Sequence, residues 1–159
     1  MHVLAHSSCR THGPLIHERA VDKVASHVDD AVNRGATVLV GGKPLEGSFF
    51  LPTVLSNVAQ DSILTDEETF GPVAALIKFE TEEDAIKLAN DSKFGLAGYF
   101  FSRDVGRVWR VAEALEVGMV GANTSAIAAA CMPFGGVKAS SVYLLISSYL
   151  LHTGKWPWS

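Results

Sequence analysis

The residues best suited to bind a ligand lie near the middle of the sequence, in the stretch EETFGPV at 67–73. Two carboxylates, Glu67 and Glu68, precede an aromatic residue, Phe70, and a Gly-Pro step follows. Glycine permits unusual φ angles, whereas proline fixes its own φ and keeps the preceding residue out of the α region. Such a corner holds a carboxylate and a ring in a fixed relation, as a ligand site requires. An acidic surface turn before a strand explains the same residues, and composition alone favours that second interpretation.

A second candidate stretch, PFGGVK at 133–138, combines Phe134 with two glycines and a lysine. Gly135 and Gly136 allow the backbone to approach another group closely. Ordinary packing of a loop explains these residues as well as a binding site does.

The sequence gives little support for a metal site or a nucleophile. His2, His6, Cys9 and His12 have a spacing that zinc could use, but no second group of ligands follows them, so we expect no metal. Cys131 has no histidine partner that spacing identifies, and we do not expect it to act as a nucleophile. Two cysteines allow at most one disulfide, which makes a reducing compartment the default.

Length and composition predict one ordinary globular domain of 159 residues, with 48% apolar and 19% charged residues. A formal net charge of −4 offers no basic surface, so neither nucleic acid nor an anionic membrane is an expected partner. Residues 1–12 have neither the apolar core of a secretory signal nor the composition of a mitochondrial transit peptide. The longest apolar run, 142–151, is far shorter than the roughly 20 residues that span a bilayer.

The first half of the chain predicts one helix followed by three extended segments. Apolar residues recur with helical spacing over 21–32, and Gly35 is the expected stop. The members of this apolar face are Val21, Val24, Ala25, Val28, Ala31 and Val32. Short β-branched or apolar runs then predict a strand at 36–40, an extended segment at 49–58 that Pro52 interrupts, and a strand at 73–79.

In the second half, helices and strands alternate. Thr81 is the expected cap of a helix at 82–90, with Ala85, Leu88 and Ala89 on its buried side. A strand at 97–101 comes next, followed by a helix that Ser102 or Asp104 begins and a strand at 117–122. The expected apolar stripe of this second helix is Val105, Val108, Trp109, Ala112 and Leu115. Such alternation predicts an α/β fold with a largely parallel sheet.

The two candidate stretches resemble motifs of one known family. ETFGPV at 68–73 is similar to the E-x-F-G-P-V motif of the aldehyde dehydrogenase superfamily, and PFGGVK is similar to its P-F-G-G-x-K motif. GLAGYF at 95–100 and WRVAE at 109–113 resemble most the succinate-semialdehyde dehydrogenase branch. The resemblance predicts an unmatched leader at 1–12, a catalytic-domain fragment at 13–140 with three layers and a mainly parallel sheet, and an unmatched apolar tail at 141–159.

The resemblance also implies roles for three residues. In that family the glutamate aligned with Glu68 binds the hydroxyls of the nicotinamide ribose of NAD or NADP. The aromatic aligned with Phe70 packs on the nicotinamide, and the one aligned with Phe134 lines the tunnel for the aldehyde, which is oxidised to a carboxylic acid. Phe70 as an ordinary core aromatic is the alternative.

Other features depart from the family pattern. Ala128 stands where succinate-semialdehyde dehydrogenases place a serine that binds the substrate carboxylate, which favours a less polar aldehyde. The family's nucleophilic cysteine and its Rossmann-type domain precede the region of resemblance, so we expect this chain to contain no catalytic residue and to be inactive alone. A catalytically silent fragment that associates with full-length subunits is the alternative. Homo-oligomers are typical of the family but not expected here, because the tail differs where relatives have their partner-pairing strand. By resemblance the compartment is mitochondrial or cytoplasmic.

Overall fold

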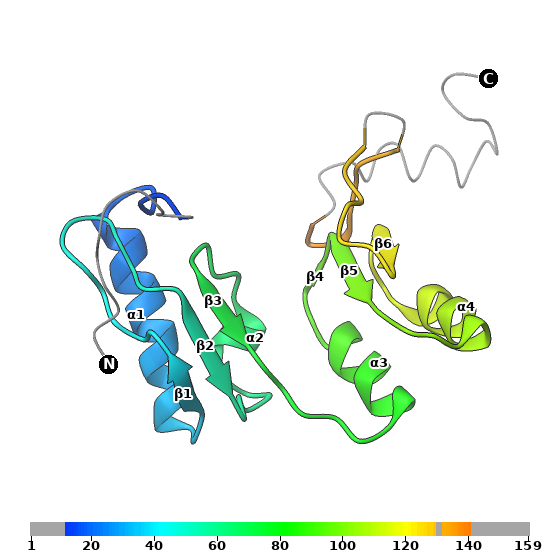
Figure 1. Ribbon diagram of the computed structural model, residues 1–159, viewed down its shortest axis with the longest axis horizontal. Coiled ribbons are helices and arrows are strands. Elements are labelled where there is room, and N and C mark those ends of the chain that lie inside the picture. Colours follow the sequence, from blue (N-terminus) through cyan, green and yellow to red (C-terminus); the bar gives the residue numbers. More distant parts are fainter. Residues whose placement is uncertain (1–11, 130–131, 141–159) are drawn as a thin grey trace. The chain divides into compact units, whose positions relative to one another are not determined.

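The computed structural model describes residues 12–129 and 132–140. The chain forms two compact units, Met1–Lys78 and Phe79–Ser159, and each is described by itself (Figure 1). Cys9, Cys131 and the tail at 141–159 lie outside the described residues, as do His2 and His6.

The first unit is built on helix α1, Glu18–Asn33, which packs on a three-stranded sheet. His17 caps its first turn, because the ring Nδ1 accepts a hydrogen bond of 3.0 Å from the Ala20 amide. Gly35, with φ +101°, follows the helix and confirms the expected stop. The unit's core comprises Val21, Val24, Val28, Ala31, Ala36, Phe50, Leu55 and Val58.

The expected apolar face of α1 is correct except at its margins. Val32 is exposed and Ala25 is only half-buried, whereas His27 is buried on the same face. Val32 lies at the edge of the apolar stripe, where the sheet no longer covers the helix. A histidine therefore occupies a core position that the apolar pattern assigned to no residue.

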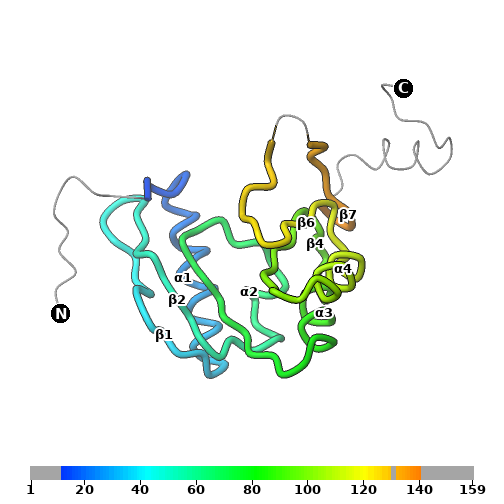
Figure 2. The backbone as a smooth tube through the Cα atoms, turned by 45° about the vertical axis from the view of Figure 1, so that its right-hand side comes forward, coloured from blue at the N-terminus to red at the C-terminus, as the bar shows by residue number. Residues whose placement is uncertain are grey.

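The sheet of the first unit has the order β1-β2-β3 and mixes both strand directions. β1, Thr37–Val40, pairs antiparallel with β2, Thr53–Ser56, and β2 pairs parallel with β3, Val73–Ala75. A short helix, α2, Ile63–Asp66, lies on the connection between β2 and β3, and Figure 2 follows the backbone through it. The strand expected at 73–79 ends at Ala75, although the Leu76 amide still donates to the Leu55 carbonyl at 2.9 Å. The Gly-Pro step thus lies directly before β3.

The second unit contains a parallel β-α-β unit beside a further helix and a small antiparallel pair. β5, Ala97–Phe100, leads through α4, Val105–Ala114, to β6, Met119–Ala122, and β5 and β6 pair in parallel. α3, Glu82–Asn90, precedes them, and β4, Phe94–Gly95, pairs antiparallel with β7, Val137–Lys138. The expected starts are confirmed: the Thr81 side chain accepts from the Asp84 amide, and that of Asp104 from the Arg107 amide.

The apolar stripes predicted for these two helices are partly wrong. On α4, Val105 and Trp109 are 72% and 67% exposed, and Val108, Val111, Ala112 and Leu115 form the half-buried side. On α3, Ala89 is exposed, whereas Ile86 is half-buried. Apolar spacing shows which residues share a face, but burial also requires a partner, and no described residue of the second unit covers these positions.

Parallel pairing in both units, together with the helices, confirms the α/β class. Within the part of the chain that the structure describes, no helix has the length and apolar character needed to cross a membrane.

Candidate functional site

The corner at residues 67–70 alternates between side chains that contact α1 and side chains that face away. Glu67 leaves α2 with extended backbone angles, φ −111° and ψ 146°. In an extended chain, successive side chains point to opposite sides. Glu67 and Thr69 contact α1, although the Glu67 side chain is itself half exposed. Glu68 and Phe70 are exposed, Phe70 to 73%, so both residues assigned to the cofactor are accessible to a ligand.

Three contacts attach this corner to α1. The Glu67 carboxylate lies 3.1 Å from Lys23 Nζ and 3.6 Å from His27 Nε2. His27 Nδ1 lies 2.7 Å from Thr69 Oγ1, so one imidazole contacts the residues on both sides of Glu68. The Lys23–Glu67 pair is half exposed and contributes about 0–1 kcal/mol at most. The His27–Thr69 bond is partly buried and is therefore the stronger attachment.

The Gly-Pro step is held between α1 and β2. A Cβ atom added at Gly71 would lie 2.5 Å from Val24 Cγ2, so the backbone passes too close to α1 for any larger residue. The Pro72 carbonyl accepts a hydrogen bond of 2.7 Å from the Thr53 amide. Proline fixes φ at this point, and the corner consequently has one backbone path into β3.

Burial keeps the histidine of this cluster neutral. Desolvation lowers the pKa of His27, the nearby Lys23 ammonium lowers it further, and the Glu67 and Asp30 carboxylates oppose the shift. Asp30 itself joins α1 to α2, because its carboxylate accepts from the Ile63 amide at 2.9 Å. That hydrogen bond, and next the bond from Arg34, lower the pKa of Asp30.

Glu68 is available to an incoming ligand. Among the described residues, no hydrogen bond or ion pair engages its exposed carboxylate, in contrast to that of Glu67. A carboxylate is a pure acceptor whose two oxygens suit a vicinal diol. The exposed Phe70 ring two residues away offers an apolar face beside that acceptor.

Phe134 lines a small cavity in the second unit. Its volume is about 200 Å³, and the lining is mostly apolar. The lining residues are Leu96, Ala97, Tyr99, Met119, Ser125, Ala126, Ile127, Ala128 and Phe134. The structure thus brings Phe134 and Ala128 to one cavity, and Ser125 places a hydroxyl-bearing residue there that the sequence did not single out.

The two glycines after Phe134 differ in their surroundings. A Cβ added at Gly136 would lie 2.8 Å from Ser140 Cβ, whereas one at Gly135 would meet nothing within 4 Å. The close approach involving Gly135 is instead to Gly118, where an added Cβ would collide with the Gly135 carbonyl. The expectation of tight backbone packing is therefore correct for Gly136. At Gly135 a side chain would fit, and it is Gly118, packed against the Gly135 carbonyl, that has no room for one.

Lys138, the last residue of the second motif, has a structural role. Its Nζ donates to the carbonyls of Asn90 and Ser92 at 2.7 and 3.1 Å, and it lies 2.7 Å from the Glu116 carboxylate. Asn90 is the last residue of α3 and Ser92 lies two residues beyond it, where helix carbonyls lack partners within the helix. The motif lysine thus connects β7 to α3.

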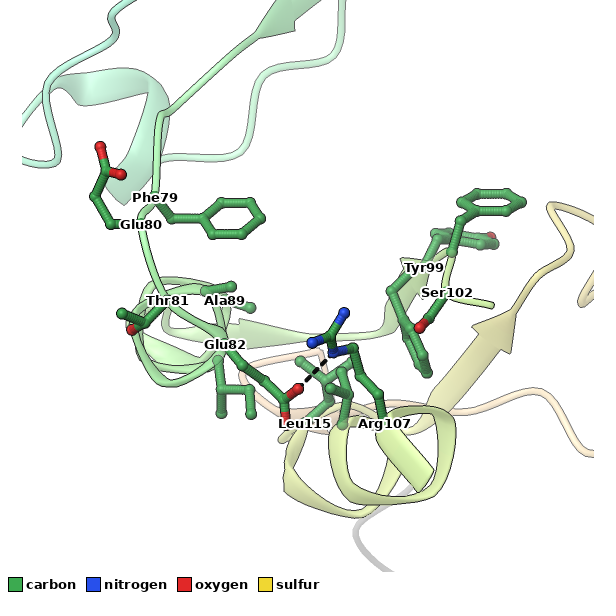
Figure 3. Close-up of a pocket in the computed structure, with 14 residues that line it drawn as sticks. Phe79, Glu80, Thr81, Glu82, Ala89, Tyr99, Ser102, Arg107 and Leu115 are labelled. Atoms are coloured by element: carbon green, nitrogen blue, oxygen red, sulfur yellow. Dashed lines mark hydrogen bonds and ion pairs between the residues drawn. The ribbon is translucent and has the colours of Figure 1, made fainter. Parts of the chain in front are cut away.

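A larger hollow of about 440 Å³ lies between α3, β5 and α4, and Figure 3 shows its lining. Arg107 Nε lies 2.6 Å from Glu82 Oε2 across this hollow, and Arg110 also binds Glu82. Phe79, Tyr99 and Leu115 line it too. None of the residues predicted to bind cofactor or substrate lines this hollow, and the ion pairs join the two helices.

A model of the aldehyde dehydrogenase family matches residues 6–151. The chain belongs to the aldehyde dehydrogenase family, as its two motifs predicted.

Similar proteins include enzymes of the succinate-semialdehyde dehydrogenase branch. Mitochondrial succinate-semialdehyde dehydrogenase from Rattus norvegicus is 58% identical over 134 residues, which are 83% of this chain and 26% of that enzyme. Succinate-semialdehyde dehydrogenase [NADP(+)] 1 from Schizosaccharomyces pombe is 55% identical, over 82% of this chain and 27% of the enzyme. The crystal structure of succinate-semialdehyde dehydrogenase from Burkholderia pseudomallei matches with a TM-score of 0.81 and 56% identity, over 83% of this chain and 28% of that one. The chain spans about a quarter of the length of the curated relatives it matches.

Proposed function

We propose that this chain supplies the nicotinamide-ribose contact and one wall of the aldehyde site in an NAD(P)-dependent aldehyde dehydrogenase. The observation that carries the proposal is the corner at 67–70, where the Glu68 carboxylate has no partner among the described residues and the exposed Phe70 ring lies two residues further along the chain. The reaction is oxidation of an aldehyde to its carboxylic acid, as in succinate-semialdehyde dehydrogenase-like enzymes.

The carboxylate and the aromatic ring of the corner suit the nicotinamide riboside part of the cofactor. Glu68 accepts hydrogen bonds from the two ribose hydroxyls, and Phe70 packs on the nicotinamide ring and limits its orientations. NAD or NADP, when bound, supplies the chemistry of a hydride acceptor. The name of the Schizosaccharomyces pombe relative specifies NADP. NAD and NADP differ only at the 2′ position of the adenosine ribose, so a contact to the nicotinamide ribose would not distinguish them.

The cavity around Phe134 is proposed to hold the aldehyde's chain. Its lining is largely apolar, and Ala128 presents only a methyl group to it. Ser125 supplies the one aliphatic hydroxyl among the lining residues of this cavity. An aldehyde less polar than succinate semialdehyde fits this lining better, because a carboxylate there would lose hydration without an ionic partner.

The cofactor contact is tested by titrating the ¹⁵N-labelled chain with nicotinamide mononucleotide, which carries the ring and ribose without the adenosine half. We expect weak binding that shifts the signals of Glu68 and Phe70. Glu68→Gln should weaken it about three- to tenfold, because a charged acceptor of hydroxyl hydrogen bonds becomes a neutral one.

Glu46→Gln is the matched control, since Glu46 is also exposed but belongs to the loop after β1. Equal affinity of the wild-type chain and the Glu68→Gln variant would rule out the assigned role of Glu68.

A further inference from the structure

The residue that holds the cofactor corner in place belongs to a helix far from it in sequence. His27 lies on α1, 42 positions from Thr69, and is only 3% exposed. A histidine on the apolar face of a helix requires polar partners, and both of its partners are residues of the corner.

The contacts of His27 lie on both sides of Glu68 in the sequence. Nδ1 binds the Thr69 hydroxyl at 2.7 Å, and Nε2 lies 3.6 Å from the Glu67 carboxylate. Residues 67 and 69 are held against α1, and Glu68 between them is exposed. Phe70, which follows Thr69, is exposed as well.

We propose that His27 is a positioning residue for the nicotinamide contact: its hydrogen bond to Thr69, beside the Lys23–Glu67 ion pair, holds the corner against α1 so that Glu68 and Phe70 stay accessible to the cofactor. This inference rests on the proposed function of Glu68 and Phe70. His27 itself touches neither cofactor nor substrate, and it acts through the backbone of the corner.

The imidazole that performs this role is the neutral form. The charged groups that face it are Lys23 and Asp30 from its own helix and Glu67 from the corner. Burial and Lys23 disfavour protonation more than the two carboxylates favour it. A neutral ring has one donor and one acceptor nitrogen and can bond the Thr69 hydroxyl in either tautomer.

Four variants of the full 159-residue chain test the proposal by NMR. His27→Leu removes both contacts, and Thr69→Val removes the hydroxyl while preserving side-chain shape. His27→Asn retains a polar atom near the position of Nδ1 and is the conservative rescue. Ser26→Ala, an exposed neighbour on α1, is the matched control.

Two readouts are measured for each variant: the backbone order of residues 67–70 without ligand, and the affinity for nicotinamide mononucleotide. We expect His27→Leu and Thr69→Val to loosen the corner and weaken binding about three- to tenfold. His27→Asn should stay within about twofold of the wild type, and Ser26→Ala should be unchanged. Thermal melting identifies any variant that fails to fold. If His27→Leu does not fold, the result for Thr69→Val, which leaves α1 intact, decides whether the positioning role holds.

The outcomes separate the two ideas. If nicotinamide mononucleotide does not shift the signals of Glu68 and Phe70 in the wild type, the proposed function fails. The role of His27 is then tested only by the backbone order of residues 67–70 without ligand. An ordered corner in both His27→Leu and Thr69→Val, or unchanged affinity in both where the wild type binds, overturns the positioning role.

Discussion

At the scale of single residues, the corner contains two residues that contact α1 and, next to each of them in sequence, a residue proposed to bind the cofactor. Glu67 and Thr69 bind α1, whereas Glu68 and Phe70 remain exposed. A sequence can reveal the motif but not this division, because the attachment depends on a histidine about forty residues earlier. The available signal was a histidine between Val24 and Val28 on an apolar helical face.

The lowered pKa of His27 predicts a specific dependence of stability on pH. In the unfolded chain a histidine has a pKa of about 6.5. The folded pKa is lower, so the unfolded state binds more protons, and the stabilisation present above about pH 6.5 is lost as the pH falls toward the folded pKa.

Urea unfolding of the wild type and His27→Asn checks this prediction between pH 8 and 5. The difference in their free energies of unfolding should be constant above about pH 6.5 and change below it, to the disadvantage of the wild type. A difference that stays flat throughout would contradict the direction of the shift. The comparison cancels the other histidines, and the stabilisation that accompanies the lowered pKa of Asp30 is lost only below about pH 4, outside this range.

At the scale of elements, the positions of helices and strands followed from the sequence more closely than their burial did. α3 and α4 begin after the expected caps, since capping depends on local residues such as Thr81 and Asp104. The exposed side chain of Trp109 was expected to be buried, and its burial depends on what else covers α4. The resemblance implied a tunnel role for Phe134, but the other lining residues of its cavity could not be predicted, because residues of β5, β6 and the following loop converge there only by tertiary packing.

Lys138 provides the test at this scale. Lys138→Met preserves much of the side chain but removes the donor to the Asn90 and Ser92 carbonyls. We expect the free energy of unfolding of the second unit to fall by about 2 kcal/mol, the magnitude of lost hydrogen bonds to a charged group. The Glu116 contact should contribute little, because that carboxylate is largely exposed.

Urea unfolding monitored on signals of α3 measures this loss, with Lys43→Met as the control for removing an exposed lysine. Equal stability of Lys138→Met and Lys43→Met would show that the motif lysine does not hold α3. The sequence predicted the motif, but only the structure shows that its lysine binds a helix end.

At the scale of the whole molecule, the chain forms two units, and its matched part covers about a quarter of the length of its relatives. Apolar side chains remain exposed on β1 and on α4, among them Leu39, Val40 and Trp109. Such surfaces favour association with other polypeptide. This observation favours the second candidate function, a catalytically inactive fragment that associates with full-length subunits.

We expect the purified chain alone to show no aldehyde oxidation with NAD or NADP, because the described residues include a proposed ribose contact but no activated nucleophile. Absorbance of the reduced cofactor, with succinate semialdehyde and hexanal as substrates, measures this. Sustained reduction that Cys131→Ser abolishes would refute the expectation. A pull-down with a full-length relative separates an isolated fragment from an interacting one.

The alternating attachment of the corner makes its length as important as its composition. Deleting one residue between Asp66 and Gly71 would exchange the two sets of side chains, so that a ligand-binding residue would meet α1 while an anchoring residue turned outward. A substitution at any one of these positions does not change which of the other side chains contact α1. Within this segment, insertions and deletions should therefore be tolerated far less than replacements, even replacements of the residues with the most contacts.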